Sequence, residues 1–244
     1  MKVYGRSDIG MLRQENQDAF GVCPLQGGAL LSVVCDGMGG ESGGKEAADT
    51  CVSTFLSAYN EKNIPTAEDL ADTLLSANIE ILAKRDKNGY ARMGTTVVLA
   101  LATEQALTLL WAGDSRAYLL HGDALSRLTR DHSYVQALVD GGKIPPEEAR
   151  THPKRNLITR AVGVSDTVEP DTLTLAWSEG DRLLLCSDGL YGMVEEKELL
   201  EILSEEHTVE RTAHELICAA NSHGGEDNIT VLLLENTKEN HPDA

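Results

Sequence analysis

Two Asp-Gly pairs in this chain each follow an apolar run that is typical of a buried strand. Asp36-Gly37 comes after the run 31–35 and Asp188-Gly189 after the run 183–187. An aspartate at such a place lies where a sheet meets solvent, and the glycine lets a backbone carbonyl approach an ion or ligand closely. Because Asp-Gly is also a common turn, one pair alone would not define a site.

Three further aspartates occupy similar positions next to apolar runs. If all five converge, their like charges raise one another's pKa, and a cation would relieve the repulsion. Ligation by oxygen alone favours Mg²⁺ or Mn²⁺ over zinc, which prefers histidine and cysteine at short spacing. The seven histidines form no such spacing. The three further aspartates are Asp18, Asp114 and Asp227, next to the runs 19–22, 107–112 and 229–234.

One arginine lies close in sequence to this set of acids. Arg13 precedes Asp18 by five residues. A guanidinium beside a carboxylate-held cation is a natural bidentate partner for phosphate oxygens. Taken alone, Arg13 would more simply be assigned to a surface salt bridge. Together with the aspartates it indicates chemistry on a phosphate ester.

Hydrophobic spacing predicts the elements that must position these residues. Several short apolar runs are separated by tight turns, so the strands they predict must be antiparallel, and a doubly wound parallel sheet is disfavoured. The polar segment 132–163 has short helical patches and predicts a lid or binding loop. Strands are predicted at about 29–35, 95–102, 106–112, 117–120, 124–128, 171–176, 182–187 and 229–234, and helices at about 48–59, 70–81, 195–203 and 208–221.

The bulk composition excludes several classes of partner. The chain has 244 residues and a formal charge of −18, from 39 acids against 21 bases. Such a charge repels nucleic acids and anionic membrane surfaces, so neither is expected as a partner. The five cysteines contain no CxxC pair, and no signal segment or membrane-spanning run is evident. A cytoplasmic protein is expected, and a monomer is the default because no heptad repeat is present.

Seven motifs in order along the chain resemble those of the type 2C metal-dependent protein phosphatases, most closely their compact bacterial branch. They extend over nearly the whole chain, and seven in register are far more specific than any one. The motifs are Leu12-Arg13-x-x-Asn16-Gln17-Asp18, Asp36-Gly37-Met38-Gly39-Gly40, Gly94-Thr95-Thr96, Gly113-Asp114-Ser115-Arg116, Leu128-Thr-Arg-Asp131-His132-Ser133, Ser187-Asp188-Gly189 and Asp227-Asn228-Ile229-Thr230.

The resemblance implies an α+β fold, a four-layer α-β-β-α sandwich of two mostly antiparallel sheets flanked by helix pairs. Residues 1–235 would form a single catalytic domain with a flap at about 132–163, and residues 236–244 a disordered polar tail. The implied activity is hydrolysis of phosphoserine and phosphothreonine in protein substrates by direct attack of a metal-bridging hydroxide. A cognate Ser/Thr kinase would be the antagonist.

The resemblance also implies roles for individual residues around two core Mn²⁺ or Mg²⁺ ions, with room for a third, weaker ion. Asp36 would bridge the core ions, and the carbonyl of Gly37 would bind one of them. Arg13 would bind phosphate, so Arg13, Asp18 and Asp36 are the expected catalytic residues. The remaining metal ligands would be Asp18, which acts on the water shell, Asp188, Asp227 and, at the third ion, Asp114.

Two departures from the family pattern leave parts of this assignment open. Many members carry a histidine where this chain has Met38 or Glu41. The acid that protonates the leaving group is therefore either a water or a flap residue such as His132, for which a flap-anchoring role is the other reading. Gln17 stands where some relatives have a metal-binding glutamate, so the second ion would be held mostly through waters.

Two other classes of function compete with this reading. The segment 39–45 satisfies the GxxxxGK pattern of a P-loop, but Glu46 stands where a Mg²⁺-binding Ser or Thr is required. A non-catalytic relative that only binds phosphoproteins is the second alternative. All the metal carboxylates and Arg13 are present, which favours the enzyme.

Exhaustive chelation is expected to abolish hydrolysis of p-nitrophenyl phosphate, because the carboxylates alone supply no positive charge for the phosphate. Activity should return with Mn²⁺ in the micromolar to millimolar range. A chelated protein that retains full activity would contradict the metal-dependent reading.

Overall fold

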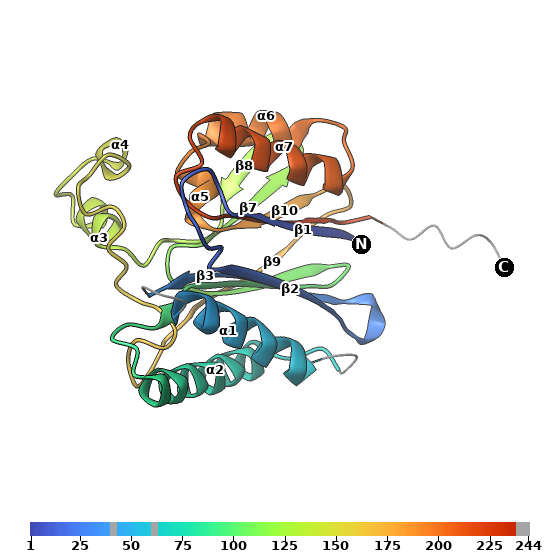
Figure 1. The fold of residues 1–244 in the computed structure, drawn as a ribbon. Helices are drawn as coiled ribbons and strands as arrows, with labels where there is room; N and C mark the ends of the chain where they lie inside the picture. Colours follow the sequence, from blue (N-terminus) through green and yellow to red (C-terminus); the bar gives the residue numbers. More distant parts are fainter. Residues whose placement is uncertain (40–42, 60–62, 238–244) are drawn as a thin grey trace.

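The chain forms two antiparallel sheets with helices on their outer faces (Figure 1). The computed structural model describes residues 1–39, 43–59 and 63–237. The strands are β1 (Lys2–Asp8), β2 (Asp18–Pro24), β3 (Leu30–Met38), β4 (Gly94–Thr95), β5 (Val97–Ala102), β6 (Ala106–Ala112), β7 (Arg116–His121), β8 (Ala124–Arg127), β9 (Asp171–Ala176), β10 (Arg182–Cys186) and β11 (Ile229–Glu235). The helices are α1 (Gly43–Tyr59), α2 (Ala67–Asn88), α3 (Tyr134–Asp140), α4 (Pro146–Ala149), α5 (Asp188–Tyr191), α6 (Glu196–Ser204) and α7 (Val209–Ser222), with a short 3₁₀ turn at Gln26–Gly28.

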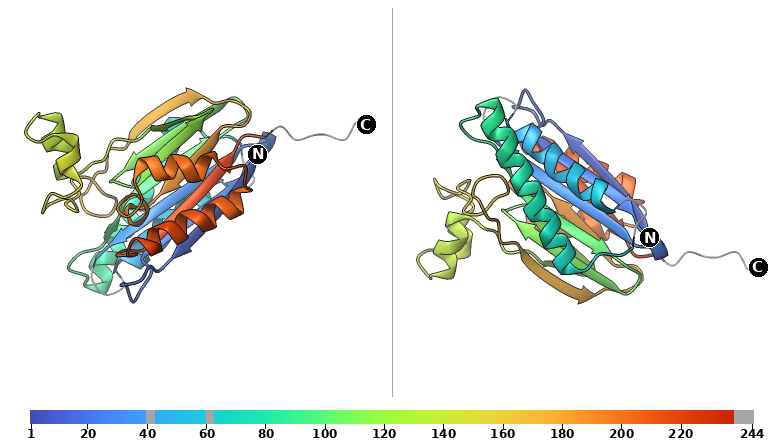
Figure 2. Two further views of the ribbon diagram at one scale, coloured as in Figure 1. Left: turned by 90° about the horizontal axis from the view of Figure 1, so that it is seen from above. Right: turned by 90° about the horizontal axis from the view of Figure 1, so that it is seen from below.

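One sheet has the order β1-β11-β10-β7-β8 and the other β2-β3-β5-β6-β9, with β4 paired to β3. The pairings recorded between these strands are antiparallel. Helices α1 and α2 cover one sheet and α6 and α7 the other, so the layers run α-β-β-α (Figures 1 and 2). The predicted fold class is confirmed. A parallel nucleotide-binding sheet is excluded, and with it the P-loop alternative.

The central strands are apolar on both faces because each face packs against another layer. In β5, Val97, Leu99 and Leu101 point into the core beneath α1 and α2. The alternate residues Val98 and Ala100 lie in the core between the two sheets. The two-residue period of a strand therefore divides one continuous apolar run between two cores.

The helix pairs close the two outer cores. Phe55 of α1 and Leu70 and Leu74 of α2 are fully buried against the first sheet. Helix α2 begins with a capping box between Thr66 and Asp69, which satisfies free backbone donors of its first turn. Within the described part of the chain, no helix combines the length and apolar character that a bilayer-spanning segment needs.

The flap projects from one end of the sandwich, where the β1–β2 loop also lies, and carries α3 and α4 (Figures 1 and 2). Its base is fixed to the body. Asn78 of α2 is fully buried and accepts a bond from the Gly163 amide (2.7 Å), and its amide donates to the carbonyls of Ser165 (2.9 Å) and Asp166 (3.3 Å). Farther out, Arg150 donates to the carbonyl of Gly192 at 3.0 Å.

The amino-terminal strand β1 was not predicted, because its sequence is short and polar. It forms because every residue from Lys2 to Asp8 pairs with β11, and because Gly5 leaves room for the Phe20 ring. Pairing with β11 and contact with β2 of the other sheet, rather than local pattern, stabilise it.

The predicted disordered tail is wrong for its first residue. Asn236 is buried, and its backbone pairs with Gly180 and Asp181. Thr237 is also described, and its carbonyl accepts a bond from the Met1 amino group. The rest of the predicted tail, residues 238–244, lies outside the described residues. Gly40 of the second motif and Glu41, one of the places where relatives have histidine, also lie outside the described residues.

Replacement of Asn78 by alanine is expected to lower the free energy of unfolding by about 3 kcal/mol, because a buried amide and three hydrogen bonds are lost. Chemical denaturation measures this change. Ser76→Ala on the exposed face of the same helix removes one bond to the Asp72 carbonyl and serves as the control. Equal stability of the two variants would contradict the anchoring role of Asn78.

Candidate active site

The five aspartates come from both sheets and meet at the flap end of the sandwich. Asp18 and Asp36 stand directly opposite each other on β2 and β3, so their side chains share one face of that sheet. Asp188 is the first residue of α5, directly after β10, and Asp227 precedes β11. Asp114 lies in the turn between β6 and β7.

The charges of these acids act on one another. Burial raises the pKa of Asp36 well above its usual range, and the charges of Asp188, Asp18, Asp114 and Asp227 raise this pKa further. The charges of the other four carboxylates therefore all act on the pKa of Asp36. The other four aspartates that the sequence singled out therefore lie close enough to Asp36 for their charges to act on it.

Three of the other acids, Asp18, Asp114 and Asp188, also have a raised pKa. Burial and the charges of Asp188 and Asp227 raise the pKa of Asp18 to about 7, against lowering hydrogen bonds from Thr230 and Ser187. Burial and Asp188 raise the pKa of Asp114 to about 8. Burial and Asp227 raise the pKa of Asp188 to about 6. Such a group of acids is stable as carboxylates only beside positive charge.

Asp18 is held in place by hydroxyl groups from the opposite sheet. Ser187 donates to Asp18 Oδ2 at 2.7 Å, and the Ser187 hydroxyl in turn accepts from the Thr230 amide at 2.9 Å. Ser187 and Thr230 were not predicted as site residues. Their signal was their place in the Ser-Asp-Gly and Asp-Asn-Ile-Thr motifs, next to Asp188 and Asp227.

The backbone of Asp36 is fixed from the neighbouring strand. Its amide donates to Thr96 Oγ1 at 3.0 Å, and its carbonyl accepts from the Thr96 amide (2.8 Å) and from the Thr95 hydroxyl (2.9 Å). Thr96 Oγ1 also lies 2.7 Å from the Ser115 hydroxyl. These residues pack behind the site and position it.

The glycines of the two Asp-Gly pairs are required by close packing. A Cβ on Gly37 would lie 2.2 Å from the carbonyl oxygen of Gly44, at the start of α1. A Cβ on Gly189 would lie 2.1 Å from the carbonyl oxygen of Asn228. Gly189 lies within α5 and packs against the segment that carries Asp227.

Arg13 lies beside the acids and forms an ion pair with Asp227 at 2.6 Å. Its positive charge also lowers the pKa of Asp188. The loop around it is braced by Asn228, whose side chain donates to the carbonyls of Ile9 and Glu15 and accepts from the Gln17 amide. Arg13 itself remains about half exposed, accessible to a substrate.

Asp114 is fixed from the side of the second sheet. Tyr191 donates to the Asp114 carbonyl at 3.0 Å. The Tyr191 ring in turn stacks under the Arg116 guanidinium, 3.5 Å from its centroid. Arg116 pairs bidentately with Asp131 at the base of the flap, at 3.0 and 2.7 Å. Asp114 is thus coupled to the flap through packed and charged contacts.

His132 contacts the base of the flap rather than the acids. Its Nδ1 accepts from the Gly113 amide at 3.1 Å, while Nε2 lies 3.0 Å from the Arg160 guanidinium and 3.4 Å from Asp171. The ring stacks on Trp111. Both nitrogens are occupied, which supports flap anchoring over protonation of a leaving group.

The donor set fits a hard divalent cation. One oxygen of Asp114 and one of Asp188 are buried without a hydrogen-bond partner, which is costly unless an ion satisfies them. As they are oriented in this structure, the described side chains form no group of three or more acidic, histidine or cysteine residues that could hold a metal ion. Asp18 and Asp227 instead bond to Ser187 and Arg13. Asp36 and Asp188 keep partial solvent access, so an ion can reach the group.

Neither cysteine beside the acids is suited to act as a nucleophile. Burial raises the pKa of the Cys186 thiol to about 12, and raises the pKa of Cys35 well above its usual range. A thiolate is the reactive form of cysteine. These groups are therefore core residues.

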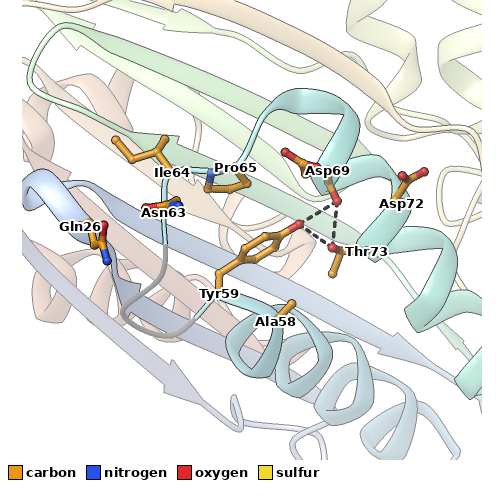
Figure 3. Close-up of a pocket in the computed structure, with 9 residues that line it drawn as sticks. All are labelled: Gln26, Ala58, Tyr59, Asn63, Ile64, Pro65, Asp69, Asp72 and Thr73. Carbon is orange, nitrogen blue, oxygen red and sulfur yellow. Dashed lines mark hydrogen bonds between the residues drawn. The ribbon is translucent and has the colours of Figure 1, made fainter.

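A hollow of about 620 Å³ lies away from this site, between the end of α1 and the start of α2 (Figure 3). The Tyr59 hydroxyl donates there to the Asp69 carbonyl at 2.7 Å and lies 2.6 Å from the Thr73 hydroxyl. None of the five aspartates lines it, and neither does Arg13. It belongs to the junction of the helix pair.

The fold and the site together define a metal-dependent hydrolase of phosphate esters. A family profile described as protein phosphatase 2C matches residues 12–218. The serine/threonine phosphatase stp of Listeria innocua is 41% identical over 239 residues, 94% of each chain. The crystal structure of the serine/threonine phosphatase Stp1 from Staphylococcus aureus has a TM-score of 0.90 at 34% identity, covering 96% of this chain and 94% of that one. The catalytic domain of the phosphatase PstP in complex with two manganese ions has a TM-score of 0.87 at 34% identity, covering 97% and 98%.

The chain belongs to the protein phosphatase 2C family. It is a metal-dependent protein serine/threonine phosphatase, a hydrolase of phosphate monoesters in proteins. The resemblance of its seven motifs to the type 2C phosphatases is thereby confirmed.

In the presence of a chelator, the protein is expected to lose stability as pH rises from about 4 to about 8. The usual aspartate pKa of 3.8 is raised to about 7 in Asp18 and about 8 in Asp114. Groups with a raised pKa in the folded state contribute stability that is lost as pH rises through that pKa. Asp114→Asn removes one of these groups and should flatten the fall in Tm.

Thermal unfolding across this pH range measures the effect. Asp123→Asn, in the exposed β7–β8 turn, is the matched control and should follow the wild type. An unchanged slope in Asp114→Asn would show that the acids do not repel one another as described.

Proposed function

We propose that this phosphatase removes phosphate from serine and threonine with the five aspartates as ligands of two core Mn²⁺ or Mg²⁺ ions and a third, weaker one. The observation that carries this assignment is the buried group of mutually repelling carboxylates with unpaired oxygens on Asp114 and Asp188, next to Arg13. Asp36 is the proposed bridging ligand, because the charges of the other four aspartates all raise its pKa. Gly37 would contribute its carbonyl.

Arg13 is the proposed phosphate-binding residue. Its guanidinium donates in the fork geometry that matches two phosphate oxygens, and a substrate phosphate would take over from Asp227 as its partner. The exchange frees an Asp227 oxygen for an ion. Divalent cations bound by these ligands supply the positive charge that stabilises the reacting phosphoryl group and make water a better nucleophile at neutral pH.

The residues around the acids would hold their carboxylates and backbone in fixed positions during the reaction. Ser187 holds one oxygen of Asp18, and this contact would orient the carboxylate toward water at the site. Thr96 fixes the backbone of Asp36. A proton for the departing serine or threonine oxygen must come from water or another group, because both nitrogens of His132 are occupied.

We also propose that residues 1–235 act as one catalytic domain, with 132–163 as the flap beside the site. The core shared between the two sheets supports this division. Phosphorylated proteins are the expected substrates of a phosphatase of this family, and a cognate Ser/Thr kinase is the proposed antagonist. A cytoplasmic location is proposed, in keeping with cysteines that form no disulfide among the described residues. A monomer is proposed as the oligomeric state.

Replacement of Asp36 by asparagine is expected to lower kcat/KM for p-nitrophenyl phosphate with Mn²⁺ by about a hundredfold or more, because the central ligand loses its charge. Asp123→Asn is the matched control, an exposed acid in a turn, and should retain wild-type activity. If the wild type hydrolyses no phosphate ester with Mn²⁺, the protein is instead a phosphoprotein-binding relative.

Arg13→Ala is expected to raise KM for a phosphothreonine peptide and to lower kcat/KM by about a hundredfold, since a charge-assisted bidentate contact is lost. Arg13→Lys keeps the charge without the fork and should recover only part of the loss. Steady-state kinetics of phosphate release measures both. Wild-type kinetics in Arg13→Ala would remove Arg13 from the site.

A further inference from the structure

The loop between β1 and β2 exposes three large apolar side chains directly before Arg13. Ile9 is 38% exposed, Met11 66% and Leu12 69%. Single exposed apolar residues are common on protein surfaces, but a group of them at a functional site indicates an interaction surface. We call Ile9, Met11 and Leu12 the apolar shelf.

The exposure of the shelf does not come from a loose loop. The Met11 amide donates to the Gly225 carbonyl at 2.8 Å, and the Gly10 amide donates to Asp8 at 2.9 Å. Gly10 adopts φ +79° and packs so closely that a Cβ would lie 2.2 Å from the Asp227 carbonyl oxygen. The backbone is held on the body while the side chains of Met11 and Leu12 point outward.

The same contacts fix the distance between the shelf and the site. Gly10 packs on Asp227, and Arg13 pairs with the carboxylate of Asp227. Leu12 is the neighbour of Arg13 in the chain. A polypeptide whose phosphate reaches Arg13 must therefore pass over or beside the shelf with the residues next to its phosphorylated side chain.

We propose that the apolar shelf binds a large apolar side chain adjacent to the phosphorylated residue, and so selects phosphoproteins with an apolar flanking residue. The inference rests on the proposed role of Arg13 as the phosphate-binding residue. The shelf is continuous with the catalytic site. Because the loop is already ordered, little conformational entropy is lost when a substrate side chain covers Met11 and Leu12.

The test uses three phosphothreonine peptides that differ only beside the phosphorylated residue: leucine before it, leucine after it, or serine on both sides. For the wild-type protein with Mn²⁺, kcat/KM is expected to be about tenfold higher for one leucine peptide than for the serine peptide, from the apolar area that leaves water. The difference should lie in KM. Comparing peptides within one variant cancels any general loss of activity.

In Leu12→Ser, and more fully in a Met11→Ser/Leu12→Ser double variant, the leucine-to-serine ratio is expected to fall close to one. Ile79→Ser is the matched control: Ile79 is 58% exposed, but on α2, and the ratio should stay at the wild-type value. A ratio near one in the wild type, or a ratio that Leu12→Ser leaves unchanged, would overturn the shelf.

Failure of the underlying phosphatase assignment would look different. In that case Mn²⁺-dependent hydrolysis of p-nitrophenyl phosphate, which carries no flanking residue, would be absent in the wild type. Normal hydrolysis of p-nitrophenyl phosphate without discrimination among the three peptides would instead reject the shelf alone.

Discussion

Mutual repulsion of five carboxylates at one end of a two-sheet sandwich is the constraint on which the rest of this structure depends. Burial and like charge raise the pKa of Asp36, Asp18, Asp114 and Asp188. A small protein tolerates such a group only if the surrounding scaffold is rigid. The four layers provide that rigidity, because each sheet is covered on both faces and packs through alternating residues of its strands.

The hydrogen bonds around the acids show how the scaffold holds them. Ser187 from one sheet reaches Asp18 on the other. Asn228 ties the β1–β2 loop to the start of β11. Buried polar networks of this kind are stable only when their members are satisfied. The oxygens of Asp114 and Asp188 that have no hydrogen-bond partner are therefore the atoms we propose as cation ligands. The flap is joined to the same group through the Arg116–Asp131 pair, because Arg116 packs on Tyr191, which donates to the Asp114 carbonyl.

Much of this could be read from the chain because its pattern is strong. Short continuous apolar runs bounded by turn residues predicted the central strands, and helical spacing predicted α1, α2, α6 and α7. The five aspartates proposed as ligands were identified by their place beside those runs. The parts that were missed depend on distant contacts. Strand β1 is stabilised by pairing with β11, and Asn236 is held by Gly180 and Asp181. Local sequence carries no signal for partners more than fifty residues away.

The sequence by itself determined which residue types stand at the strand ends, the order of the motifs and the excess of negative charge. Tertiary structure alone decided which of these residues meet. Asp18 and Asp36 face each other because of the β2–β3 register, and Arg13 meets Asp227 across most of the length of the chain. It also decided that His132 faces Gly113 and Arg160, and that Met11 and Leu12 stay in solvent beside Arg13. The order of residues along the chain fixes which chemical groups are present and which segments become strands or helices. Which of those groups lie close together follows from sheet register and layer packing.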